Sequence, residues 1–234
     1  MSPETQLWLA LSRAFQPPTD REVAKAFLDS LPAELETLCE ACGADALADI
    51  GALDDALGRL GDAEALLAHY SSLFLPPEAH VSLNLAIYLD GSLNGAAMDA
   101  IEHFLGRHGI VRAEGFRDLP DHLAVLLEVL ALLSAEKVSP GETAAFARAF
   151  LLPALPRLGA DIAAHAPDSP YRHLVNVTLA VLASRGLARE NDAPGKPRYD
   201  KSLARGVWQH CNQCGRPFAR AKELLIMARA LQDS

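Results

Sequence analysis

An almost uninterrupted apolar run, directly after Leu119-Pro120-Asp121-His122, constrains the fold more than any other segment. From Leu123 to Leu133 the run is built of Leu, Ala and Val, and its single charged residue is Glu128. Strong helix formers that are apolar on nearly every face predict a helix buried on all sides. Such a helix must be surrounded by other elements, so we expect the rest of the chain to pack around it.

Helix start and stop signals recur along the chain and predict an all-α fold. Ser2-Pro3-Glu4-Thr5 opens a helix that Pro17-Pro18 ends, and Ser139-Pro140-Gly141-Glu142 is a capping box with proline at the first helical position. Thr19-Asp20-Arg21-Glu22 is a second capping box, whose helix should turn Val23, Ala26 and Phe27 inward. Further helices are expected at 32–42, 44–58, 62–75, 94–109 and 168–187. With no alternating strand pattern and no repeat, the chain should fold as about ten helices joined by short loops.

Composition divides the chain into a large helical domain and a short appendage. We place a single all-helical domain at 1–188, because the residues that follow are rich in Pro, Gly and charge and predict a linker at 189–206. The remaining tail, 207–234, holds two cysteines and a last amphipathic helix. A chain of 234 residues, half of them hydrophobic, is long enough to bury a sizeable core.

The net charge of −9 argues against a nucleic-acid partner, because phosphates repel an acidic chain, and it favours basic partners. The apolar run is too short for a membrane span, which needs about 20 apolar residues. Met1-Ser2-Pro3-Glu4 has no basic region before an apolar core, so we expect no secretory signal. Four cysteines in a chain of this size do not indicate a disulfide framework, and we expect a cytoplasmic protein.

The acid and imidazole at the start of the apolar run allow two interpretations. In the first, Asp118 caps the helix and Asp121 lies in its first turn, where a carboxylate meets unpaired backbone N–H groups. In the second, Asp121, His122 and the adjoining apolar faces form a corner that binds a peptide with basic and leucine-like residues. The pair is weak evidence for catalysis without a neighbouring Ser or Cys nucleophile, and the chain has no phosphate loop or H-E-x-x-H motif.

Several short motifs, in order, resemble the TorD/DmsD/NarJ type of chaperone, which matures molybdenum-containing redox enzymes in the cytoplasm. The resemblance covers roughly residues 60 to 185. It is carried by Tyr70-Ser71-Ser72-Leu73-Phe74-Leu75, Tyr88-Leu89-Asp90-Gly91-Ser92-Leu93-Asn94-Gly95, Pro120-Asp121-His122, Phe150-Leu151-Leu152-Pro153 and Ser169-Pro170-Tyr171-Arg172-His173-Leu174. Leu119 and Ala154 depart from the family pattern, which often has an acid at the first position and a Trp at the second.

The resemblance implies a non-enzymatic, all-α chaperone with a TorD-like domain. Its partner would be the catalytic subunit of a molybdopterin-dependent oxidoreductase, bound through a twin-arginine signal peptide and held back from export until the cofactor is inserted. Asp121 and His122 match the family's signature for peptide binding, and Tyr88, Gly95 and Pro120 match neighbouring positions. We expect no cofactor requirement of its own, no nucleic acid, no stable membrane insertion, and a monomer or homodimer.

The cysteines form two Cys-x-x-Cys-Gly pairs, far apart in the sequence. Cys39 and Cys42 share a helical face with leucines and are expected to be small buried residues. Cys211 and Cys214 follow His210 in the tail and resemble half of a zinc knuckle, so a zinc or iron–sulfur site there is the main alternative. A metal-binding or thiol redox protein, and a plain helical interaction scaffold, therefore stay open beside the chaperone hypothesis.

Overall fold

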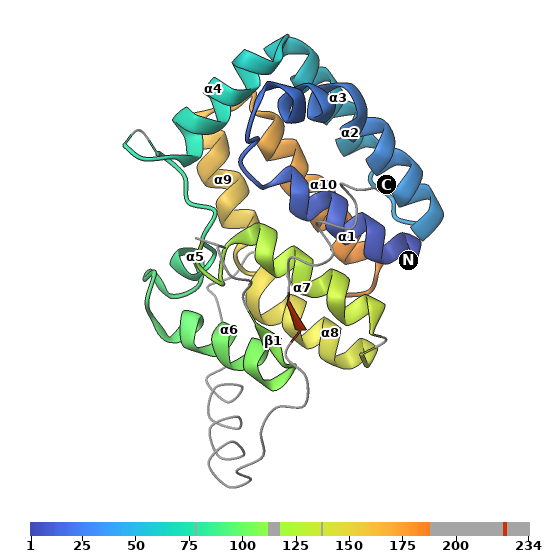
Figure 1. The fold of residues 1–234 in the computed structure, drawn as a ribbon, viewed down its shortest axis with the longest axis vertical. Helices are drawn as coiled ribbons and strands as arrows, with labels where there is room; N and C mark the ends of the chain where they lie inside the picture. The colour runs from blue at the N-terminus through green and yellow to red at the C-terminus, as the bar shows by residue number, and fades with distance from the viewer. Residues whose placement is uncertain (78, 112–117, 137, 188–221, 224–234) are drawn as a thin grey trace, which may run out of the picture.

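The computed structural model describes residues 1–77, 79–111, 118–136, 138–187 and 222–223, and in these the fold is all-α, as predicted (Figure 1). The first half contains α1 (Pro3–Ala14), α2 (Arg21–Cys42), α3 (Leu47–Leu60), α4 (Ala63–Phe74), α5 (Ala86–Asp90) and α6 (Ala96–Arg107). The second half contains α7 (Leu123–Ala135), α8 (Pro140–Phe146), a π-helical turn (Ala147–Leu151), α9 (Leu155–His165) and α10 (Pro170–Ser184). The two-residue strands β1 (Ile110–Val111) and β2 (Lys222–Glu223) pair in parallel.

The apolar run forms α7, and every residue from Leu123 to Leu133 is buried, which confirms the central helix. Helix α1 lies along α7 and covers one side of it with fully buried side chains, among them Leu7, Trp8 and Leu11. Ser12 Oγ donates a hydrogen bond to the Ala124 carbonyl oxygen at 2.7 Å and joins the two helices near the start of α7. The segment therefore organises the core because its pattern leaves no face that suits solvent.

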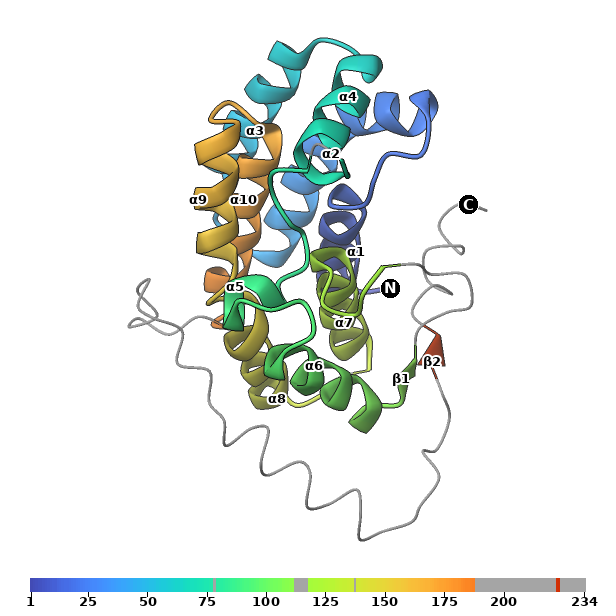
Figure 2. The same cartoon turned by 90° about the vertical axis from the view of Figure 1, so that its left-hand side faces the viewer.

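The other helices surround this pair and extend it in two directions. Figure 2 shows α2, α3 and α4 at one end of the molecule and α6, α8 and β1 at the other, with α7 between them. Helix α10 packs against α3 and α9, and α2 packs against α1, α3 and α4. One continuous hydrophobic cluster runs through these contacts. Among the described helices, none combines the length and the apolar character that a membrane crossing needs.

Two details of α2 differ from the sequence-based expectation. Asp20, not Thr19, caps the helix by accepting a hydrogen bond from the Val23 amide at 2.9 Å, and Val23 is exposed. Helix α2 also runs unbroken through Pro32, where separate helices were expected. An internal proline costs about 3 kcal/mol. The burial of Leu31 and Leu35 on the two sides of Pro32 offsets that cost.

The chain between α4 and α6 matters most for the site, because part of it docks as an extended segment onto the start of α7. Asn84 and His122 form an isolated antiparallel bridge. The Leu85 amide donates to the Asp121 carbonyl oxygen at 3.0 Å, and the Leu123 amide donates to the Leu83 carbonyl oxygen at 2.8 Å. These bonds fix residues 83–85 beside the Asp121-His122 pair. Apart from β2, the expected linker at 189–206 and the tail at 207–234 lie outside the described residues.

Candidate functional site

A groove of about 490 Å³ opens where the segment after α4 meets the start of α7 and one side of α9. Its walls therefore come from elements that are distant in the sequence. It is lined by Pro17, Tyr70, Phe74, Leu75, Pro76, Ala79, His80, Val81, Ser82, Leu83, Asn84, Ile87, Tyr88, Asp118, His122 and Asp161. This volume suits a few side chains of an extended peptide or a small molecule.

One wall of the groove is apolar and partly open to solvent. The rings of Tyr70 and Phe74 on α4 pack in a tilted arrangement, with centroids 5.0 Å apart and planes at 57°. The Tyr70 hydroxyl donates to the Phe15 carbonyl oxygen at 3.2 Å. Leu75 and Ile87 are 40% and 39% exposed on the rim. Because the burial of large apolar side chains lowers the free energy, this wall favours an apolar ligand residue.

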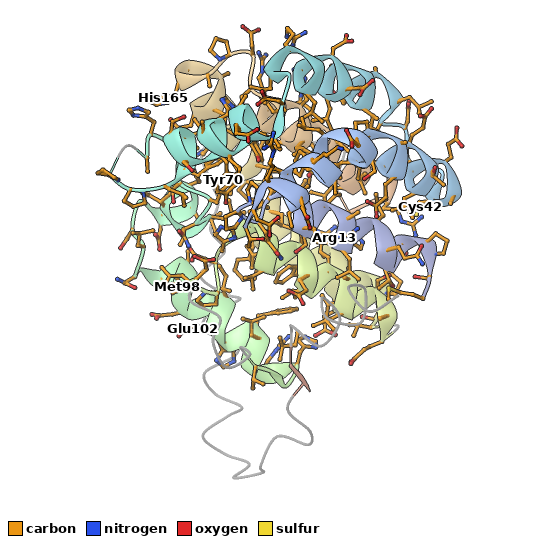
Figure 3. All side chains as sticks on the ribbon, turned by 45° about the horizontal axis from the view of Figure 1, so that its top comes forward. Arg13, Cys42, Tyr70, Met98, Glu102 and His165 are labelled. Atoms are coloured by element: carbon orange, nitrogen blue, oxygen red, sulfur yellow. The ribbon has the colours of Figure 1, made fainter. Side chains whose placement is uncertain are left out.

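The other side of the groove carries polar and charged groups. The Tyr88 hydroxyl donates to Asp161 Oδ2 at 2.8 Å, and Arg157 Nη1 donates to the Tyr88 carbonyl oxygen at 2.7 Å, so α5 and α9 are tied together there. The His80 ring lies on the rim and stacks on His165 of α9 with centroids 5.3 Å apart. Figure 3 labels His165 and Tyr70 on the same side of the molecule. The carboxylates of Asp118 and Asp161 give the groove a negative character.

Asp121 lies behind the groove and is fully buried, at 0% exposure. Its Oδ1 accepts a hydrogen bond from Asn84 Nδ2 at 2.9 Å, and its Oδ2 accepts one from the Ala86 amide at 3.0 Å. The carboxylate thus supplies the N-terminal cap of α5 from another part of the chain. Burial raises the pKa of Asp121, although both hydrogen bonds act in the opposite direction. In this arrangement Asp121 holds the groove segment in place.

His122, not Asp118 or Asp121, caps helix α7, which corrects the expected capping arrangement. Its Nδ1 accepts a hydrogen bond from the Ala124 amide at 3.2 Å. An accepting Nδ1 requires the neutral ring with its proton on Nε2. Burial lowers the pKa of His122, which favours the same neutral form, while the charge of Asp118 acts against it. The ring is 7% exposed and lines the groove.

The remaining residues of the predicted site take different places. Tyr88 lines the groove, whereas Pro120 is half-buried in the turn before α7 and Gly95 lies at the start of α6. A Cβ at Gly95 would come within 2.5 Å of Asp90 Oδ2, the oxygen that accepts a hydrogen bond from the Ala97 amide at 2.8 Å. A glycine is needed there for close approach, and neither Gly95 nor Pro120 is among the lining residues. Their role in peptide binding stays a prediction.

Sequence reasoning missed Asp161 and gave Asp118 a different role. Asp161 lies on α9 with Arg157 and His165 at a spacing of four residues, which is typical of any solvated helix face. Nothing in that spacing reveals that Tyr88 reaches Asp161 from a different helix. The sequence predicts a helix cap at Asp118 because this residue precedes the apolar run. Only the packing of the groove brings these two carboxylates to one cavity.

Cys39 and Cys42 are free thiols at the end of α2. Burial raises the pKa of Cys39 to about 11 and also raises that of Cys42. A helix C-terminus disfavours a thiolate, which is the reverse of the setting of a reactive Cys-x-x-Cys pair. Figure 3 places Cys42 far from Tyr70 and hence from the groove. Within the described ranges no group of three His, Cys, Asp or Glu could hold a metal ion. Cys211 and Cys214 lie outside those ranges, and their metal binding stays a prediction.

Comparison with known proteins gives a consistent family assignment. The family model described as "Nitrate reductase delta subunit" matches residues 28–155. Two curated relatives, each named "Chaperone protein TorD" and both from Vibrio vulnificus (strains YJ016 and CMCP6), are 37% identical over 88 residues. That match covers 35% of this chain and 41% of each relative, so the chain spans less than half the length of the relatives it matches. No solved structure matches.

Proposed function

Because the chain belongs to the nitrate reductase delta subunit family, we propose that it is a non-enzymatic chaperone for the maturation of a molybdopterin-dependent oxidoreductase. This membership confirms the TorD/NarJ-type family that the sequence motifs indicated. We further propose that it binds the twin-arginine signal peptide of the client's catalytic subunit. Occupation of the signal by the chaperone would delay export until the cofactor has been inserted.

The observation that carries the proposal is the composition of the groove. A twin-arginine signal is basic at its start and apolar in its middle, and the groove offers carboxylates on one side and an apolar rim at Leu75 and Ile87 on the other. The two kinds of wall thus match the two parts of the peptide. The chain's net charge of −9 would also attract a basic segment and speed its encounter.

The Asp121-His122 pair contributes in an indirect way within this proposal. Asp121 clamps the segment that forms the groove floor, through its bonds to Asn84 and Ala86. His122 starts α7 and presents a neutral ring at the groove. The pair therefore shapes the peptide site, and the surrounding side chains supply the contacts.

The test is a binding titration with a fluorescein-labelled peptide that carries two consecutive arginines followed by leucines. We expect saturable micromolar binding, and we expect Leu75→Gln to weaken it by roughly threefold to tenfold, since an apolar contact of about 1 kcal/mol is lost. Leu93→Gln is the matched control, because Leu93 is 42% exposed and lies outside the groove. Absence of saturable binding to the wild type, or equal affinity of the two leucine variants, would refute the proposal.

A further inference from the structure

We propose that Asp161, oriented by Tyr88, and Asp118 are the two carboxylates that pair with the adjacent arginines of the bound peptide. This inference rests on the proposed function and deepens it, because it names the residues that select a double basic motif. It also moves the ionic contact away from Asp121, the acid that the sequence motif had suggested.

Asp121 is unsuitable for that contact because both of its oxygens already accept hydrogen bonds inside the protein. Its side chain is 0% exposed, and the donors are Asn84 Nδ2 and the Ala86 amide. A peptide guanidinium would have to displace these bonds, and the freed Ala86 amide would be left buried without a partner. The desolvation penalty of such an unsatisfied group would remove most of the gain from an ion pair.

Asp161 has the opposite properties. Its side chain is 35% exposed, and Oδ2 accepts a hydrogen bond from the Tyr88 hydroxyl at 2.8 Å. Arg157 holds Tyr88 in turn, by donating to its carbonyl oxygen at 2.7 Å. The nearest imidazole nitrogen, His165 Nδ1, lies 3.6 Å from Oδ1 and 2.9 Å from the Asp161 carbonyl oxygen. The carboxylate is thus fixed in orientation and keeps acceptor sites for the planar fork of a guanidinium.

Asp118 supplies the second negative charge at a different part of the groove, just before α7. Burial raises the pKa of the Tyr70 hydroxyl, and the nearby negative charge of Asp118 raises it further. Asp118 and Asp161 thus belong to different elements of the groove. Consecutive side chains of an extended peptide point in opposite directions, so two adjacent arginines suit two carboxylates that are set apart in this way.

The discriminating experiment measures affinity by fluorescence anisotropy with two labelled probes, the Arg-Arg peptide and its Gln-Gln counterpart. Asp161→Asn should weaken Arg-Arg binding by about tenfold, the equivalent of one charge-assisted hydrogen bond. Asp118→Asn should weaken it by roughly threefold, since exposed ion pairs contribute less. Asp99→Asn, an exposed acid of α6 outside the groove, removes the same charge and should leave the affinity unchanged. The Gln-Gln probe should not distinguish the four proteins.

Tyr88→Phe gives an independent arm that keeps the negative charge of the groove. We expect it to weaken Arg-Arg binding by roughly threefold, and to have little further effect when Asp161→Asn is present, because the hydroxyl acts through that carboxylate. Far-UV circular dichroism checks that each variant is folded. If Asp161→Asn fails to fold, the selective effect of Tyr88→Phe on the Arg-Arg probe decides the matter.

The outcomes separate this inference from the proposed function. If the wild type binds neither probe, the proposed function fails and the inference fails with it. If the wild type binds the Arg-Arg probe but Asp161→Asn and Asp118→Asn bind it as tightly as Asp99→Asn does, the inference is wrong and the groove proposal stands. Equal weakening of both probes by Asp161→Asn would also overturn the inference, because it would indicate a structural role.

Discussion

Replacing Glu128 by glutamine should stabilise the protein above neutral pH. Glu128 lies in the middle of α7, is 5% exposed, and its Oε1 has no hydrogen-bond partner among the described residues. Burial raises the pKa of its carboxyl from 4.5 to about 7. A buried carboxylate is costly unless it is paired, whereas a glutamine of the same shape carries no charge.

The sign and size of the effect follow from proton linkage. Between pH 4.5 and about 7 the folded protein keeps the Glu128 proton that the unfolded chain has lost, so stability falls as pH rises through this window. Above this pH window, the stability that the retained Glu128 proton contributes is completely lost. At about 1.4 kcal/mol per pH unit, the gap between the two pKa values corresponds to at most about 3 kcal/mol. Glu128→Gln should therefore match the wild type below pH 4.5, differ from it by less than about 1 kcal/mol at pH 5, and exceed its stability by up to about 3 kcal/mol at pH 8.

Urea unfolding followed by far-UV circular dichroism at pH 5, 6, 7 and 8 measures the difference in the free energy of unfolding between the two proteins. Taking the difference cancels the titration of groups that both proteins share. Glu102→Gln is the control, because Glu102 is an exposed glutamate of α6 (Figure 3), so its replacement removes the same charge from the surface instead of from the core. A stability difference that is the same at pH 5 and pH 8, or a Glu128→Gln protein that is less stable at pH 8, would refute the reasoning.

Two further predictions concern the residues that shape the groove. Asp121→Ala should lower the free energy of unfolding by roughly 3 kcal/mol, because the Asn84 side-chain amide and the buried Ala86 N–H lose their acceptor. Asp99→Asn, at an exposed acid of α6, should stay near wild type in the same urea assay. Equal stability of the two variants would show that Asp121 is not a clamp. Gly95→Ala should cost about 1–3 kcal/mol in thermal or urea unfolding, since its Cβ would displace the Asp90 carboxylate from the Ala97 amide. A Gly95→Ala protein of wild-type stability would contradict the proposed close contact.

Local patterns predicted the elements well where the cause was local. The apolar run specified α7, and the caps at Ser2 and Ser139 accept hydrogen bonds from the Thr5 and Glu142 amides, as their positions in the sequence implied. The same logic failed at Pro32, where a local helix-breaking signal was outweighed by burial against the rest of the core. Helix existence thus followed from short-range chemistry, while helix continuity depended on tertiary packing.

The sequence indicated some residues of the candidate site but not the contacts that they make. The motif drew attention to His122 and Tyr88, which line the groove, and to Asp121, which lies buried behind it. Asp121 bonds instead to residues 37 and 35 positions away, and Asp161 receives its hydrogen bond from a tyrosine 73 positions away. No local pattern encodes contacts at such separations.

The sequence by itself determined an all-α chain organised around one buried helix, because helix propensity, capping and apolar periodicity act over a few residues. The tertiary structure alone decided which carboxylate is buried as a clamp and which carboxylates line the groove. Asp121 and Asp161 have the same side chain and differ only in their surroundings. The oxygens of Asp121 are enclosed by hydrogen-bond donors, so this residue stabilises the fold. One side of Asp161 faces solvent, so this carboxylate is open to a ligand.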